Sequence, residues 1–207
     1  LLYASHSPIA ANSVRMRTLL NEIGRSEIKA IGGFLSAAKS INSVQRGETQ
    51  ATVISAPYYL ARKQQIDDEG LLTPLAQSGY RTRDGSIRRS VSIDLPTYEE
   101  VWRNYGDSSE NNAEWMLFSA YSYAASIQVL FALPPATEES VHEIWSDALE
   151  RAFLDPEYLA LRERLGGSEV VFNDAQSTTE NLAALKTLFL DPFVIEALTD
   201  YAPALRK

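Results

Sequence analysis

The first third of the chain alternates short apolar runs with segments of helical periodicity. We expect three strands, at residues 1–4, 28–31 and 51–54. Each is followed by small or hydroxyl-bearing residues and then by a helical pattern, at about residues 13–24, 36–46 and from Pro57 onward. Asn12 or Ser13 is the expected N-cap of the first helix. Three strand–turn–helix units in succession predict an α/β fold with a parallel-rich sheet.

The middle of the chain is less regular. Residues 72–77 predict another strand, and residues 81–89, with four basic residues, predict a loop or a weak hairpin. Thr97 is the expected cap of a helix over 98–104, because Glu99 and Glu100 then lie in its first turn. Residues 113–125 are rich in aromatic side chains and predict a buried helix.

The last third is mainly helical. We expect strands at 127–133 and 170–172, and helices capped by Thr137, opened by Asp155-Pro156, spanning 182–189 and opened by Asp191-Pro192. The helix after Thr137 carries the clearest amphipathic stripe of the chain, whose members we expect to face inward: Val141, Ile144, Trp145, Ala148, Leu149, Ala152 and Phe153.

Composition narrows the function classes. Among 207 residues, 45% are hydrophobic and 22% charged, which is typical of a globular protein. The net charge of -8 disfavours nucleic acid as the main partner, because a nucleic-acid footprint needs a basic face. The absence of cysteine excludes disulfides and thiolate sites. The chain begins within an apolar run, Leu1-Leu2-Tyr3-Ala4, so we expect it to be a fragment or a trimmed product.

Catalytic motifs are scarce. His6 and His142 are the only imidazoles, and we find no nucleophile elbow, phosphate-binding glycine loop or metal-binding histidine spacing. We therefore expect no enzyme, no cofactor and no metal. A small α/β enzyme that uses His6 and Ser7 stays an alternative.

The turns after the three expected strands are better candidates for function. They span Ser5–Ser13, Gly32–Ser36 and Ser55–Pro57, and in a parallel sheet they lie at one edge. Helix N-termini there present free N–H groups and a partial positive charge, which suits a small anion. The alternative is that these residues serve only as helix caps with solvated backbones.

Several segments, in the same order along the chain, resemble the receptors of tripartite tricarboxylate transporters (the TctC or Bug family of solute-binding proteins). The resemblance is carried by Gly33-Phe34-Leu35-Ser36, Arg46-Gly47-Glu48, residues 73–79, residues 94–100, residues 133–137, residues 153–157 and residues 190–194. It spans essentially the whole chain.

This resemblance implies a type II periplasmic-binding fold that closes over a small organic carboxylate. It implies an α/β ligand-binding lobe at 1–125, and at 126–207 a return strand and helices that pack with a second, incomplete lobe. It also implies that roughly the first third of a receptor, with a Pro-Gly-Gly ligand loop, is missing. The implied partners are a carboxylate and the membrane subunits of the transporter, and the implied location is the periplasm.

The ligand residues that follow from the turns and the resemblance are Ser5, His6, Ser7, Asn12, Ser13, Gly32, Gly33, Phe34, Ser36, Ser55, Ala56 and Pro57. This chain has Ala10, Ala11 and Asn12 where the family often has glycines, which favours side-chain contacts in the first turn. Some relatives carry Arg in the segment where this chain has Ser126-Ile127-Gln128. If that Arg supports the cleft in those relatives, the ligand of this chain is less charged or is held differently. A ligand-sensing domain of a regulator is a further alternative, since it can share this architecture.

Overall fold

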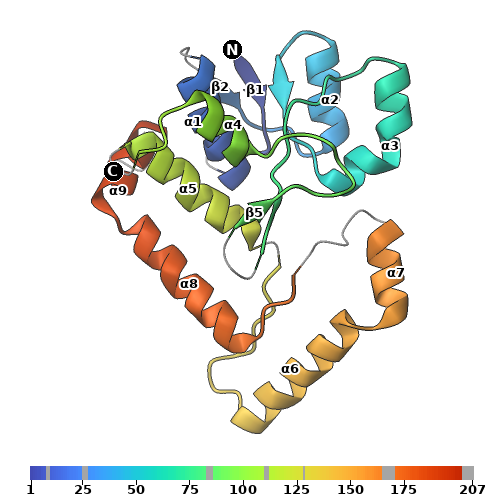
Figure 1. Cartoon of the computed structure of the whole chain (residues 1–207), viewed down its shortest axis with the longest axis vertical. Coiled ribbons are helices and arrows are strands. Elements are labelled where there is room, and N and C mark those ends of the chain that lie inside the picture. The colour runs from blue at the N-terminus through green and yellow to red at the C-terminus, as the bar shows by residue number, and fades with distance from the viewer. Residues whose placement is uncertain are drawn as a thin grey trace.

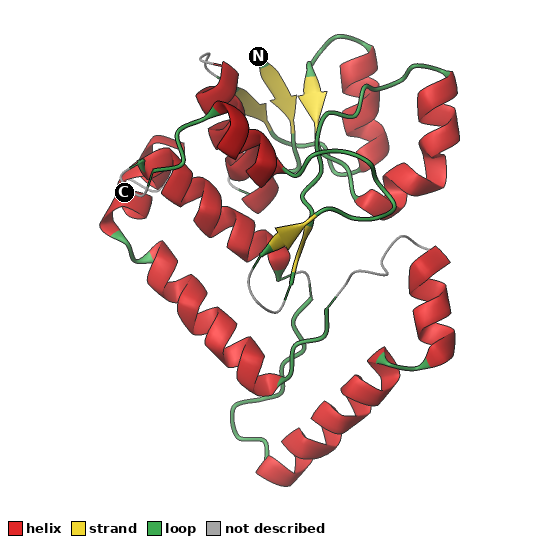
Figure 2. Ribbon diagram, in the orientation of Figure 1, coloured by secondary structure: helices red, strands yellow, loops and turns green. Residues whose placement is uncertain are grey.

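A three-stranded parallel sheet forms the N-terminal part of the computed structural model (Figures 1 and 2). The structure describes residues 1–7, 10–24, 28–82, 86–109, 112–127, 129–164 and 171–201. The strands are β1 (Leu2–Ala4), β2 (Lys29–Ile31) and β3 (Ala51–Thr52), in the order β2-β1-β3. Tyr3 of the central strand lies opposite Ala30 on one side and Ala51 on the other. The predicted α/β class is confirmed.

Two helices connect these strands in opposite directions. Helix α1 (Ala11–Gly24) leads from β1 to β2, and α2 (Ala37–Gln45) leads from β2 across to β3, which α3 (Ala56–Asp68) follows. Because crossovers between parallel strands are right-handed, opposite directions place α1 and α2 on opposite faces of the sheet (Figure 1). The chain therefore reverses its direction of winding at β1.

A helical core packs beside α1. It contains α4 (Tyr98–Tyr105), α5 (Ala113–Ser126) and α9 (Pro192–Tyr201). Two clusters of buried side chains fill it: Val14, Leu117, Ala120, Val194, Ala197 and Tyr201, and Leu19, Tyr98, Trp102 and Phe118. The Tyr201 hydroxyl donates to Glu114 Oε2 at 2.6 Å, so the last helix is tied to α5. Part of the segment 126–207 thus adjoins the α/β unit, and the division at residue 125 stays a prediction.

A hairpin and a long loop cross from the sheet to α4. The hairpin consists of β4 (Tyr80–Arg81) and β5 (Ile87–Arg88), which pair in antiparallel fashion. Of the two predicted alternatives, a loop or a weak hairpin, the structure has the hairpin. Gly79, just before it, has φ 67°, and a Cβ there would lie 2.5 Å from Arg88 O. The hairpin can therefore close only over a glycine at this position.

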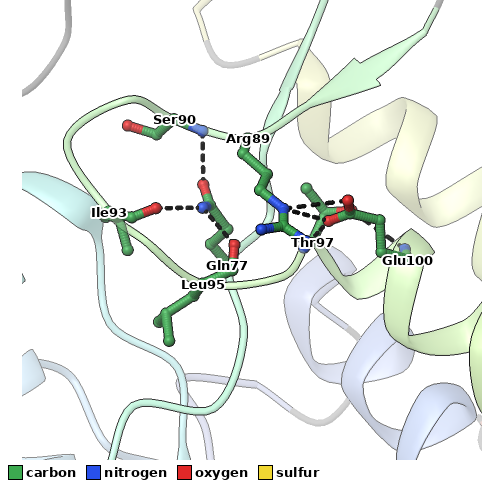
Figure 3. A network of polar contacts seen from close by, with 7 residues as sticks. All are labelled: Gln77, Arg89, Ser90, Ile93, Leu95, Thr97 and Glu100. Carbon is green, nitrogen blue, oxygen red and sulfur yellow. Dashed lines mark hydrogen bonds and ion pairs between the residues drawn. The ribbon is translucent and has the colours of Figure 1, made fainter.

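The buried Gln77 side chain organises the same loop (Figure 3). Its Nε2 donates to Ile93 O at 2.7 Å and to Leu95 O at 2.8 Å, and its Oε1 accepts from Ser90 N at 2.8 Å. One side chain thus satisfies three main-chain groups of a segment that has no regular structure of its own.

Helices α6 (Glu139–Phe153) and α7 (Pro156–Arg164) extend away from this body, and α8 (Ala175–Phe189) returns to it (Figure 1). The prediction that the α6 stripe faces inward is wrong for the described residues. None of the described α6 residues is buried; Ile144 is 66% exposed and Trp145 44%. The stripe contacts α7 and the ring of Phe131, 5.2 Å from Trp145, but an amphipathic pattern cannot by itself supply a covering surface.

Three predicted strands are also wrong in the described residues. Residues 72–77 form only one bridge, from Gln77 to Thr97, because Pro74 has no N–H to donate to a ladder. The described part of 127–133 is irregular, with Val129 89% exposed, since apolar residues form a strand only beside a pairing edge. The same applies to residues 171–172, while Val170 and Gly166-Gly167 lie outside the described residues.

The predicted helix starts are mostly confirmed. Ser36 caps α2, Pro57 lies in the first turn of α3, and Thr97 and Glu100 form a capping box on α4. Three are wrong. Helix α1 begins at Ala11, so Asn12 and Ser13 lie inside its first turn, and the N-cap of α6 is Glu138 and not Thr137. The helix expected at 182–189 already begins at Ala175. Within the described ranges, no helix is both long and apolar enough to cross a membrane.

Candidate functional site

A hollow of about 270 Å³ opens at the carboxyl end of the sheet. It lies where β1 and β3 end and where α1, α2 and α3 begin. Its lining residues are Tyr3, Ala4, Ser5, His6, Ala10, Asn12, Ser13, Phe34, Leu35, Ser36, Ala37, Ser40, Thr52, Val53, Ile54 and Ser55. The three predicted turns therefore meet in one place.

The strand order explains this position. The turn after β1 leads to α1 on one face of the sheet, and the turn after β2 leads to α2 on the other face. The two turns therefore diverge above the carboxyl end of the sheet. Ligands of open α/β sheets bind in such a crevice, at the switch point of the topology. The site thus follows from β2-β1-β3 order and from no single motif.

Seven of the predicted ligand residues line the hollow: Ser5, His6, Asn12, Ser13, Phe34, Ser36 and Ser55. The other five lie outside the lining: Ser7, Gly32, Gly33, Ala56 and Pro57. Of the pair in the enzyme alternative, His6 lines the hollow and Ser7 does not.

Main-chain donors in the second turn already have partners. Gly33 N donates to His6 O and Phe34 N donates to Ser5 O, each at 3.2 Å. Gly33 has φ 96°, which a glycine adopts without strain, and this geometry locks the second turn to the first. These two amides therefore shape the hollow and offer no N–H to a ligand.

The serine and threonine hydroxyls of the hollow mostly donate to the main chain. Ser13 Oγ donates to Ser7 O at 2.6 Å, Ser40 Oγ to Ala37 O at 2.9 Å and Thr52 Oγ1 to Ala4 O at 3.3 Å. A hydroxyl whose proton is engaged in this way keeps only its lone pairs for a ligand. Ser40 and Thr52 thus form an acceptor side of the hollow.

The first turn of α1 supplies donors instead. Asn12 is exposed and lines the hollow, and its Oδ1 accepts from Arg15 Nη2 at 2.8 Å. Ser36 Oγ caps α2 by accepting from Lys39 N at 3.3 Å, whereas the Ser55 side chain makes no cap hydrogen bond. The Asn12 amide, in the first turn of α1, therefore forms a donor side.

Arg15 lies directly behind this donor side and is only 4% exposed. It also donates from Nη2 to Ser78 Oγ at 3.3 Å and stacks 4.9 Å above the ring of Tyr98. Its Nε has no hydrogen-bond partner, and no described carboxylate forms an ion pair with it. Burial lowers the pKa of its guanidinium from the usual value, but arginine stays protonated at neutral pH.

Tyr3 contributes a buried phenol to the floor of the hollow. Burial raises the pKa of this hydroxyl well above its usual range, and neighbouring Tyr98 adds to that effect, while Ser13 and Arg15 oppose it. The phenol is therefore neutral at physiological pH and can take part only in hydrogen bonds. No described Asp, Glu, Lys or Arg side chain lines the hollow.

Sequence reasoning missed several residues of the site. The sequence pattern predicts Tyr3 and Thr52 only as strand residues and Ser40 only as a helix residue, and it gives Arg15 no role. The signal for Thr52 is its place at the end of a strand, because the last residue of a strand adjoins the turn that follows. Arg15 three residues after Asn12 is also readable as a helical neighbour pair.

A larger, open hollow of about 740 Å³ lies at the elbow of α6 and α7. Its lining is mainly apolar and includes Phe153, Tyr158 and Phe172, and Arg162 stacks 4.1 Å above the Phe153 ring. It holds none of the predicted ligand residues. In the described part of the chain, no group of three or more acidic or histidine side chains could hold a metal ion.

Comparisons with known proteins give no match: no family model, no curated protein and no solved structure matches this chain.

Proposed function

We propose that the chain is part of an extracytoplasmic receptor that binds a small organic carboxylate and delivers it to a tripartite tricarboxylate-type transporter. The observation that carries the binding proposal is the convergence of three strand-to-helix turns on one hollow at the switch point of the sheet. The transporter and the periplasmic location rest on the resemblance of the segments between Gly33 and Val194.

An anionic ligand is favoured by the charges around the hollow. No described acidic side chain lines it, the N-terminus of the 14-residue helix α1 opens into it, and a buried guanidinium lies behind Asn12. Charges act more strongly in such a poorly solvated region than in water. A carboxylate would accept from the Asn12 amide at the donor side of the hollow.

The direct test is a titration of the ¹⁵N-labelled chain with acetate, lactate, succinate, malate, glutamate and citrate, followed by NMR. We expect saturable shifts of the amides of Asn12, Ser13 and Ser36 with at least one carboxylate. The matching primary amides, such as acetamide and succinamide, serve as neutral controls. The absence of saturable shifts with every carboxylate, or shifts confined to the α6–α7 elbow, would contradict the binding proposal.

The transport role has its own test. Cells that lack the gene should lose uptake of the radiolabelled carboxylate that binds, and fractionation should place the protein in the periplasm. Unchanged uptake, or recovery of the protein in the cytoplasm, would contradict this part and favour the regulator alternative.

A further inference from the structure

The Arg15–Asn12 pair differs from an ordinary cap arrangement. Nη2 of a nine-tenths buried guanidinium donates to Asn12 Oδ1 at 2.8 Å, and its second acceptor is Ser78 Oγ, a neutral hydroxyl. A buried cation is normally paired with a carboxylate, since desolvation of an unpaired charge is costly. Arg15 has no such partner among the described residues.

The bond from Arg15 also decides how the Asn12 amide is oriented. A guanidinium only donates, so the atom that faces it must be the carbonyl oxygen, Oδ1. The other end of the Asn12 amide is Nδ2, which carries two N–H donors. Because the Asn12 side chain is exposed and lines the hollow, these donors are available to a ligand. Without Arg15 the amide could turn over and present its oxygen, which would repel an anion.

We propose that Arg15 is the positioning residue of the anion site: it orients the Asn12 amide as a donor and supplies the positive charge that a bound carboxylate neutralises. The inference rests on the proposed binding of a carboxylate and adds the residue that selects an anion over its neutral analogue. Arg15 acts through Asn12 and through its field, since it does not itself line the hollow.

The first variant is Asn12→Asp. It gives Arg15 a carboxylate partner within the protein, so we expect the melting temperature to stay equal or rise. The same change removes the donor and neutralises the cation, so carboxylate affinity should fall at least about tenfold, as for loss of a charged hydrogen bond. An aspartate in the first turn of a helix also stabilises the fold and repels an anion by itself, so the role of Arg15 is decided by the second variant.

A second variant, Arg15→Met, keeps the length of the side chain and removes its charge. We expect its affinity for the best-binding carboxylate of acetate, lactate, succinate, malate, glutamate and citrate to fall about tenfold, and its affinity for the matching primary amide to change by less than about twofold. Arg17→Met is the matched control, because Arg17 lies on the same helix but bonds Ile28 O and Tyr201 O. That control should lose stability and keep the preference for the anion.

The outcomes separate this inference from the function itself. If the wild-type chain binds no carboxylate of the panel, the proposed function is contradicted and the role of Arg15 with it. If the wild type binds but Asn12→Asp binds equally well, or if Arg15→Met weakens acid and amide alike, only the role of Arg15 is overturned.

Discussion

Arg89 and Glu100 form an ion pair between the end of the hairpin and the first turn of α4, with Arg89 Nε 2.9 Å from Glu100 Oε2 (Figure 3). The same carboxylate accepts from Thr97 N at 2.6 Å as part of the capping box. The hydrogen bond from Arg89, followed by that from the Thr97 backbone, lowers the pKa of Glu100 to about 2. One exposed side chain thus fastens a loop and caps a helix.

This pKa predicts an acid-dependent loss of stability. Because the pKa of Glu100 is lower in the folded chain than in the unfolded chain, its contribution is present above about pH 4.5 and is lost as the pH falls toward 2. Glu100→Gln should remove that contribution, about 1 kcal/mol or less for a solvent-screened pair. Urea unfolding at pH 7 and at pH 3 should therefore show a smaller pH effect in the variant.

Glu99→Gln is the control for Glu100→Gln. Glu99 lies beside Glu100 and pairs with Arg103 one turn further along the helix, and no hydrogen bond or ion pair links it to the described residues of the hairpin. Its replacement should leave most of the pH effect in place. Equal pH effects in the wild type and in Glu100→Gln would contradict the prediction.

Gln77→Ala should destabilise the chain more than the few side-chain atoms that it removes would suggest. The change leaves Ser90 N and the carbonyls of Ile93 and Leu95 without their partner in a partly buried loop, at a cost of about 2–3 kcal/mol. Because Ser78 follows directly and contacts Arg15, carboxylate binding should weaken as well. Urea unfolding and NMR titration measure the two effects.

Gln65→Ala provides the comparison for Gln77→Ala. Gln65 is an exposed glutamine on α3 whose Nε2 donates to Glu69 within the same helix. Its replacement should change the free energy of unfolding by less than about 0.5 kcal/mol. Similar losses in both variants would show that the Gln77 network does not hold the loop.

Much of the fold and of the site could be predicted from the sequence because the causes are local. Ser36 and Thr97 precede helical patterns, and a cap needs only its own next turn. The convergence of the turns at Ser5, Ser36 and Ser55 also follows from local order, since successive parallel strands end at one edge.

The rest depends on contacts between distant segments. Nothing near Arg15 in the sequence shows that Ser78 and Tyr98 will enclose it without a carboxylate. The amphipathic stripe around Trp145 predicts a helix correctly but not what covers it. The turn at Gly33 and Phe34 predicts free backbone donors, and only the tertiary fold shows that His6 O and Ser5 O already accept from them.

Trp102→Ala should cost about 3–5 kcal/mol, as for a large core aromatic residue. Trp102 is fully buried, its ring centroid lies 4.8 Å from that of Phe118 in a tilted arrangement, and its Nε1 donates to Asp107 O. Trp145→Ala, on the exposed face of α6, should cost less than about 1 kcal/mol. Thermal and urea unfolding compare the two variants, and an equal loss would show that the α6 stripe is packed.

The acceptor side of the hollow predicts a preference among carboxylates. Because Ser40 and Thr52 donate their hydroxyl protons to main-chain carbonyls, they can only accept from a ligand. Carboxylates that also carry a hydroxyl or ammonium group should therefore bind about fivefold more tightly than their unsubstituted analogues, a gain of about 1 kcal/mol. The comparison is malate with succinate and lactate with propionate, each by NMR titration.

Replacement of one hydroxyl tests this preference directly. Ser40→Ala should reduce the advantage of malate over succinate, because it removes an acceptor that lines the hollow. Ser43→Ala is the matched control on the same helix: Ser43 is buried against Thr49 with 2.9 Å between their hydroxyl oxygens, and it lies outside the hollow. The control should lose stability and keep the preference. An unchanged preference in Ser40→Ala, or equal binding of malate and succinate by the wild type, would contradict the assignment of an acceptor side.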